Sequence, residues 1–169
     1  IGLANSYSAV GRMTDALALR EETLRLQKAV LGPDHPDTLG SMSNLAISYA
    51  TQGRLAETVP LEESALRLRR ATLGPVHPDT LQSLNNLALL YSAQGRTADG
   101  VVLGEELLKQ QKSRLGPSHP DTLICMNNLA ENYAALGRAA EGLALREEVL
   151  RHRRAKLGQI PGAKVGRAW

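Results

Sequence analysis

LGPDHPDTL, at residues 31–39, returns as LGPVHPDTL at 73–81 and as LGPSHPDTL at 115–123. Each copy begins 42 residues after the one before, with no insertion or deletion between them. A tyrosine and a glycine keep the same interval on both sides of these stretches. A fixed period of this length is the signature of a repeat architecture. The recurring residues are Tyr7, Tyr49, Tyr91 and Tyr133, and Gly11, Gly53, Gly95 and Gly137.

Each repeat predicts two helices. Residues 37–52 form the first, because apolar side chains at spacings of three and four indicate one buried helical face. Pro36 suits its first turn, and Gly53 ends it because glycine readily adopts a left-handed conformation. The second helix is expected over about 55–72, with Pro60 interrupting it near its first turn. The apolar positions of the first helix are Leu39, Met42, Leu45, Ala46 and Tyr49.

A single helical pair cannot bury both of its apolar stripes, so the pairs must stack on one another. This predicts an all-α fold of stacked antiparallel helix pairs, with three and a half to four repeats. The repeats are expected at residues 1–32 (without the front of the first helix), 33–74, 75–116 and 117–158. Small residues let the two helices of each pair approach closely, and these are Ala16, Thr58, Gly100 and Gly142.

Charged residues are placed unevenly. Residues 1–150 hold 14 Lys and Arg against 17 Asp and Glu, whereas residues 151–169 hold six basic residues and no acid. A basic tail can attach to nucleic acid or anionic lipid without specificity. The favoured interpretation of residues 159–169 is a solvated, flexible end.

The second helices place a Glu four residues before a cation, an order that stabilises a helix by roughly 0.2–0.5 kcal/mol per pair. We interpret these charges as a solvated outer face, with a partner-binding site as the alternative. The pairs are Glu21 and Arg25, Glu63 and Arg67, Glu105 and Lys109, and Glu147 and Arg151.

Several function classes are disfavoured. No run of about 18 apolar residues suggests a membrane span, and no leader for secretion is visible. The single Cys125 excludes a disulfide framework and favours a reducing, cytoplasmic location. Histidines of successive repeats cannot share one ion, because stacked helices lie about 8–10 Å apart and a Zn–N bond is about 2 Å. We therefore expect His35, His77 and His119 to begin helices, and we expect no metal, no cofactor and no enzymatic activity.

NLAISYATQGRLAETVPLEESAL, at residues 44–66, resembles the tetratricopeptide repeat. The 42-residue period and the LGPxHPDT linker are similar to the kinesin-light-chain-like class of that family. The resemblance implies a right-handed α-solenoid that serves as a protein-interaction scaffold. It also leaves open that the chain forms the C-terminal sensor repeats of a larger nucleotide-switch protein. The matching residues are Leu45, Ala46 and Tyr49 in the first helix, Gly53 in the turn, and Thr58 and Ala65 in the second helix.

The resemblance also implies that the first helices line a concave groove that receives an extended peptide or a partner helix. Asparagine offers both donors and an acceptor, so stacked asparagines can grip a peptide main chain or, alternatively, only tie neighbouring helices together. The groove positions hold no Lys or Arg, which argues against a clamp for a terminal carboxylate. End-to-end self-association is also expected, because the end repeats expose apolar flanks. The groove positions are Asn5, Ser43, Asn44, Ile47, Asn85, Asn86, Leu89, Asn127, Asn128 and Glu131, with Ser8, Ala50, Ser92 and Ala134 beside them.

Overall fold

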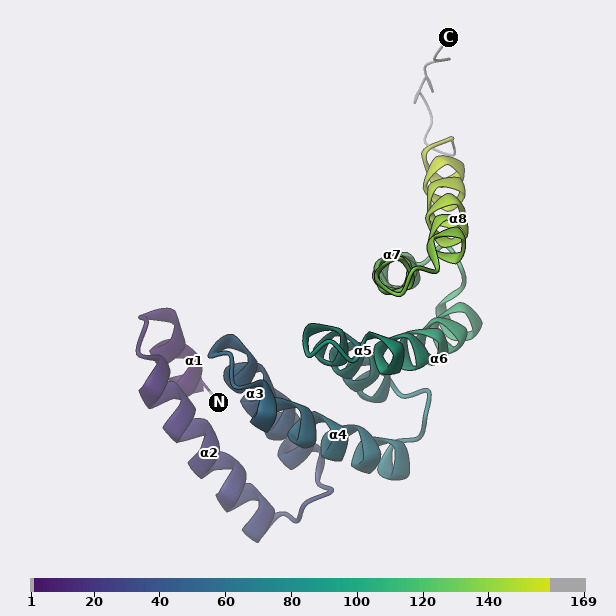
Figure 1. Cartoon of the computed structure of the whole chain (residues 1–169). Helices are drawn as coiled ribbons and strands as arrows, with labels where there is room; N and C mark the ends of the chain where they lie inside the picture. The colour runs from purple at the N-terminus through teal and green to yellow at the C-terminus, as the bar shows by residue number, and fades with distance from the viewer. Residues whose placement is uncertain (1, 159–169) are drawn as a thin grey trace. The chain divides into compact units, whose positions relative to one another are not determined.

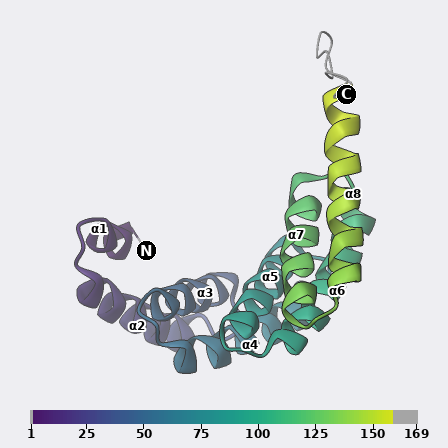
Figure 2. The same cartoon turned by 45° about the horizontal axis from the view of Figure 1, so that its top comes forward.

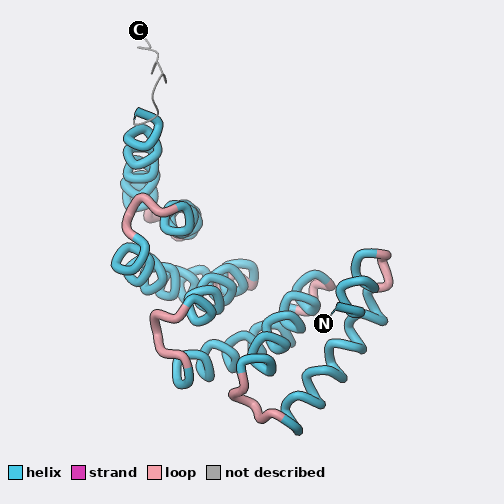
Figure 3. The backbone as a smooth tube through the Cα atoms, turned by 180° about the vertical axis from the view of Figure 1, so that it is seen from behind, coloured by secondary structure: helices cyan, strands magenta, loops and turns pink. Residues whose placement is uncertain are grey.

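A computed structural model describes residues 2–158, and helices are the only regular structure in that range (Figures 1 and 3). The expected basic tail at 159–169 lies outside the described residues. Contacts divide the chain into two compact units, Ile1–Leu90 and Tyr91–Trp169. The helices are α1 (Gly2–Ala9), α2 (Met13–Val30), α3 (Pro36–Thr51), α4 (Leu55–Thr72), α5 (Pro78–Ala93), α6 (Thr97–Leu115), α7 (Pro120–Ala135) and α8 (Ala139–Gly158).

In the first unit each helix from α1 to α4 packs on the next one (Figure 2). The core between them consists of aliphatic side chains with no aromatic ring fully buried. Thr58 on α4 is fully buried, as expected for a small residue at the crossing of two helices. The core residues are Leu17 and Leu24 of α2, Leu39, Met42 and Leu45 of α3, and Ala65 of α4.

In the second unit α6 packs on α7 and α7 packs on α8. Gly142, one of the expected small residues, lies at the contact of α7 and α8, and Gly104, which was not expected there, lies at the contact of α6 and α7. A Cβ atom added to Gly142 on α8 would lie 2.7 Å from the carbonyl oxygen of Ala130 on α7. A Cβ atom added to Gly104 on α6 would lie 3.1 Å from Cδ1 of Leu129 on α7. Close helix approach in this unit therefore depends on glycine.

The repeated histidines cap the first helices. The backbone N–H of Asp37 donates to Nδ1 of His35 at 3.2 Å, and Asp121 donates to His119 in the same way at 3.2 Å. The proline that follows each of these two histidines occupies the first turn. The expected helix-start role is confirmed, and the structure adds the hydrogen bond that performs it.

Replacing His119 by Ala is expected to lower the free energy of unfolding by about 1 kcal/mol, because an N–H in the first turn of α7 loses its acceptor. His119→Asn, which restores a capping acceptor, should recover most of this loss. Urea denaturation followed by circular dichroism measures both variants. Equal stability of the Ala variant and the parent would show that the cap contributes nothing.

Two expectations about the second helices are wrong. Pro60 does not interrupt α4, which runs continuously from Leu55 to Thr72. Pro60 is exposed, so the carbonyl that its missing N–H leaves unpaired can be hydrated. Glu21 also does not pair with Arg25. Arg25 pairs instead with Glu22 at 2.7 Å.

Glu21 accepts a hydrogen bond from the hydroxyl of Tyr49 on the next first helix, at 2.8 Å. In the second unit Glu105 accepts from Tyr133 in the same way, at 2.6 Å. Burial, and then the neighbouring carboxylate, raise the pKa of Tyr133 to about 12. These glutamates therefore connect successive repeats instead of serving only as a solvated face.

The turn inside each repeat is held by the arginine that follows the recurring glycine. Arg54 lies 4.4 Å from the centre of the Tyr49 ring and pairs with Glu57 at 2.9 Å. Its backbone N–H also donates to the carbonyl of Tyr49. Gly53 makes this turn possible with a φ of 72°. The other repeats stack Arg12 on Tyr7, Arg96 on Tyr91 and Arg138 on Tyr133.

Candidate functional site

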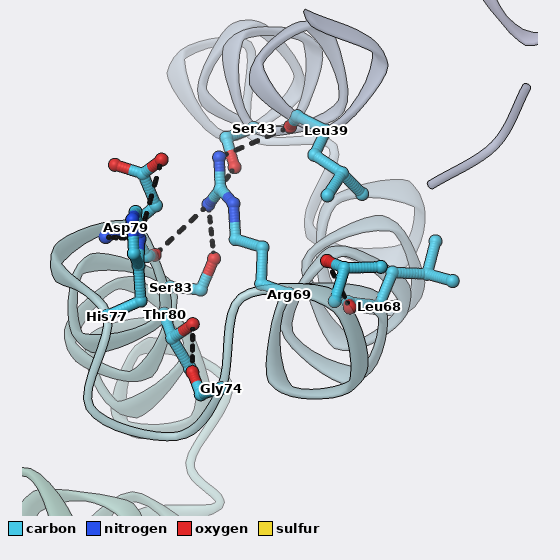
Figure 4. Close-up of polar contacts among 10 residues, drawn as sticks. Leu39, Ser43, Leu68, Arg69, Gly74, His77, Asp79, Thr80 and Ser83 are labelled. Carbon is cyan, nitrogen blue, oxygen red and sulfur yellow. Dashed lines mark hydrogen bonds and ion pairs between the residues drawn. The ribbon is translucent and has the colours of Figure 1, made fainter. Parts of the chain in front are cut away.

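The predicted groove positions lie on the first helices, and two of them are already engaged by arginines of second helices. Arg69 on α4 is only 5% exposed. Its guanidinium donates to the hydroxyls of Ser43 on α3 and Ser83 on α5 (Figure 4). It also donates to the carbonyl oxygens of Leu39 and Asp79. Ser43 is therefore buried inside the packing of the first unit.

Asn5 on α1 is exposed, but its side-chain oxygen accepts a hydrogen bond of 2.8 Å from Arg20 on α2. Arg20 also donates to the hydroxyl of Ser48 on α3. The guanidinium of Arg20 thus links the first helices of two successive repeats. The oxygen of Asn5 is consequently shared with this link.

The other asparagines among the predicted groove positions are different. All five are half-buried, and none of their side-chain amides has a hydrogen-bond partner among the described residues. Their donors and acceptors are therefore available to water or to another molecule. They are Asn44 on α3, Asn85 and Asn86 on α5, and Asn127 and Asn128 on α7.

Exposed side chains lie three residues after Asn44, Asn86 and Asn128, on the same helical side. Ile47 is 52% exposed and Leu89 is 46% exposed, both in the first unit. Glu131 is the exposed residue at this position in the second unit. We call these residues and the five asparagines with free amides the first-helix surface.

A small cavity lies beside Asn44, lined also by Ala4, Arg20, Thr23 and Ser41. Its volume of about 10 Å³ is that of a single water site. The hydroxyl of Ser41 is buried and has no hydrogen-bond partner among the described residues, so a water molecule in the cavity would supply that partner. The cavity is too small for a peptide side chain.

The sequence alone does not indicate that Arg20 and Arg69 contact the first helices. Neither arginine is present in every repeat. Arg69 aligns with Gln27 and Gln111 in the first and third repeats, and Arg20 aligns with Glu62 and Gly104 in the second and third. The fourth repeat alone has arginine at both positions, as Arg146 and Arg153. The available signal was a polar residue kept at the position of Arg69 in each second helix, because such a residue must find a hydrogen-bond partner.

Reactive groups are not gathered on this surface. Burial raises the pKa of the Cys125 thiol to about 12, so the thiol stays protonated at neutral pH. Within residues 2–158, no three side chains of His, Cys, Asp or Glu lie together in a way that would hold a metal ion. None of the helices in that range combines the length and apolar character needed to cross a membrane. The surface offers amides and aliphatic side chains.

Two sequence profiles of the tetratricopeptide repeat family match the chain, one over residues 1–71 and 42–99 and the other over 80–121 and 122–161. The nearly identical TPR-like repeats of a kinesin-light-chain-type protein from Podosopora anserina are 33% identical. That structure matches with a TM-score of 0.82 over 94% of this chain and 74% of that chain. Comparison with curated protein sequences gives no match.

A second similar structure is BtubC (BKLC) from P. vanneervenii, which is 21% identical. It matches with a TM-score of 0.84 over 99% of this chain and 66% of that chain, and at this identity it supports the fold alone. The all-α fold of packed helix pairs is confirmed. The chain belongs to the tetratricopeptide repeat family, in its kinesin-light-chain-like form, and is a scaffold for protein–protein interaction.

Proposed function

We propose that the chain holds a peptide or helical segment of a partner protein against the first-helix surface. The observation that carries this proposal is the set of half-buried asparagine amides without a hydrogen-bond partner among the described residues. An amide of this kind can donate to a peptide carbonyl and accept from a peptide N–H. Such contacts recognise the peptide main chain and depend little on the side chains of the peptide.

Sequence preference would come from the exposed side chains next to these amides. In the first unit Ile47 and Leu89 offer aliphatic contacts, whereas in the second unit Glu131 offers a negative charge. A peptide on the first unit would therefore gain from apolar side chains. A peptide on the second unit would gain from a basic side chain.

The test is a double variant, Asn86→Ala with Asn128→Ala. A peptide selected against the parent chain from a phage-displayed random library serves as the probe, with its Kd measured by isothermal titration calorimetry. The change removes one asparagine amide from each unit, and a neutral hydrogen bond contributes about 0.5–1.5 kcal/mol, so affinity at either unit should fall about two- to tenfold. Gln82→Ala, an exposed change on α5, is the matched control and should leave the Kd unchanged.

Thermal unfolding separates this proposal from the alternative in which the asparagines tie neighbouring helices together. The double variant is expected to unfold within about 2 °C of the parent. A large fall in Tm, or an unchanged Kd, would assign the asparagines a structural role and contradict the proposal.

Several expectations stay predictions. They include the absence of enzymatic activity, the cytoplasmic location and the repeat boundaries. End-to-end self-association also stays a prediction, and it is supported by an aliphatic stripe on α8. The leucines of this stripe are about half exposed, and they are Leu143, Leu150 and Leu157.

A further inference from the structure

An open groove lies between the second helices α2 and α4 of the first unit. Its floor is formed by Met42, Leu45 and Tyr49 on α3. Lys28 on α2 also lines it, together with Glu57, Pro60, Leu61 and Ser64 on α4. The volume of about 370 Å³ is within the range of roughly 300–1,000 Å³ that binding sites for small ligands occupy.

This groove does not overlap the first-helix surface. Its floor residues and the pair Asn44 and Ile47 lie on opposite sides of α3, because they differ by about half a turn at 3.6 residues per turn. Met42 and Leu45 pack toward the core, and Ile47 points to solvent. A ligand in the groove would therefore leave the asparagine amides free.

The second unit repeats most of this lining 84 residues later, with an ion pair between its two second helices. Lys112 on α6 corresponds to Lys28, and Glu148 on α8 corresponds to Ser64. Nζ of Lys112 lies 3.0 Å from Oε1 of Glu148, so an ion pair joins the two second helices. The floor is conserved between the two units, with Met126, Leu129 and Tyr133 in place of Met42, Leu45 and Tyr49.

In the first unit the corresponding cation has no such partner. Serine at position 64 carries no charge, and Lys28 forms no ion pair within the described residues. Nearby carboxylates are already engaged. Glu57 pairs with Arg54, and Glu21 accepts from the hydroxyl of Tyr49. The groove therefore combines an aliphatic floor with an uncompensated positive charge.

We propose that this groove binds an acidic peptide segment of a partner protein. A glutamate or aspartate carboxylate of the peptide pairs with Lys28, in the place that Glu148 holds in the second unit. An adjacent aliphatic side chain of the peptide packs on Tyr49 and Leu61, which line the groove and are half-buried. The site lies between the second helices, so it does not depend on peptide binding at the first-helix surface.

The probe is a fluorescein-labelled nine-residue peptide of alternating leucine and glutamate, with a leucine–lysine twin of the same length. Fluorescence polarisation with the full chain at low salt measures both peptides. The glutamate peptide should bind at least tenfold more tightly than its lysine twin. Added salt should weaken this binding, because the charge at Lys28 is exposed. Equal binding of the two peptides would overturn the proposal.

Three variants locate the binding. Ser64→Glu supplies the missing carboxylate from within the chain and should reduce affinity for the glutamate peptide tenfold or more. Lys28→Ala should weaken it about threefold, a typical effect of an exposed ion pair. Lys28→Glu should reverse the preference toward the lysine peptide, which keeps the proposal testable if Ser64→Glu folds poorly. Unchanged affinity in all three variants contradicts it.

The second unit supplies a gain-of-function control. Glu148→Ser removes the carboxylate that pairs with Lys112, so it should create a second binding site for the glutamate peptide. The stoichiometry should then rise from about one peptide per chain to about two. The double variant Asn86→Ala with Asn128→Ala should bind this peptide like the parent. Lost binding in that double variant would place the peptide on the first-helix surface and overturn the groove assignment.

Discussion

Replacing Arg69 by Ala is expected to lower the free energy of unfolding by about 3 kcal/mol and to shift Tm downward by about 6–12 °C. The guanidinium is 5% exposed and bonds four acceptors from two first helices. Its removal leaves the hydroxyls of Ser43 and Ser83 buried without this donor. Each such group costs about 1–3 kcal/mol. Urea and thermal denaturation of the purified chain measure the loss.

The first and third repeats provide the control for this prediction. They place glutamine at the position of Arg69, namely Gln27 and Gln111. Arg69→Gln keeps one donor group at the site, so it should recover about half of the stability that Arg69→Ala loses. If both variants unfold like the parent, the hydrogen bonds of Arg69 do not hold α3 and α5 against α4.

Replacing Gly142 by Ala is expected to cost about 2–3 kcal/mol. The added methyl group would lie 2.7 Å from the carbonyl oxygen of Ala130, which belongs to the backbone of α7 and cannot rotate away. α8 must therefore move off α7, and overpacking of this kind typically costs about 1–3 kcal/mol. The gain in helix propensity, about 1 kcal/mol at most, does not offset it.

Two other helical glycines separate crowding from propensity. A methyl group at Gly104 would lie 3.1 Å from the end of the flexible Leu129 side chain, so Gly104→Ala should be close to neutral. Gly40 has nothing within 4 Å of the added atom, and Gly40→Ala should stabilise the chain by about 0.5–1 kcal/mol. Urea denaturation should rank the variants Gly40, Gly104, Gly142 from most to least stable. Any other order would contradict the packing argument.

The 42-residue period predicted most of the fold. The first helix expected at 37–52 is α3, Pro36–Thr51, and the second expected at 55–72 is α4, Leu55–Thr72. These bounds were accessible because a proline and a positive-φ glycine mark them locally. The sequence also indicates Gly142 as a position of close helix contact. It does not indicate which atom of the preceding helix Gly142 approaches.

The contacts between repeats were not predicted, because they join residues about 30 positions apart. Glu21 has a cation four residues later, and local helix geometry alone makes Arg25 its natural partner. The structure instead gives Glu21 the hydroxyl of Tyr49, which is fixed only once α2 packs on α3. The sequence also could not show that the asparagine amides are free. Whether an amide has a hydrogen-bond partner depends on every side chain that packs around it.

The burial of Cys125 has a practical consequence. It is the only thiol in the chain, and its sulfur lies 3.7 Å from the carbonyl oxygen of Gly104, sealed between α6 and α7. A thiol-reactive dye can label it only after these two helices part. The labelling rate therefore measures how often α6 and α7 separate in the second unit. It does not report on opening of the first unit.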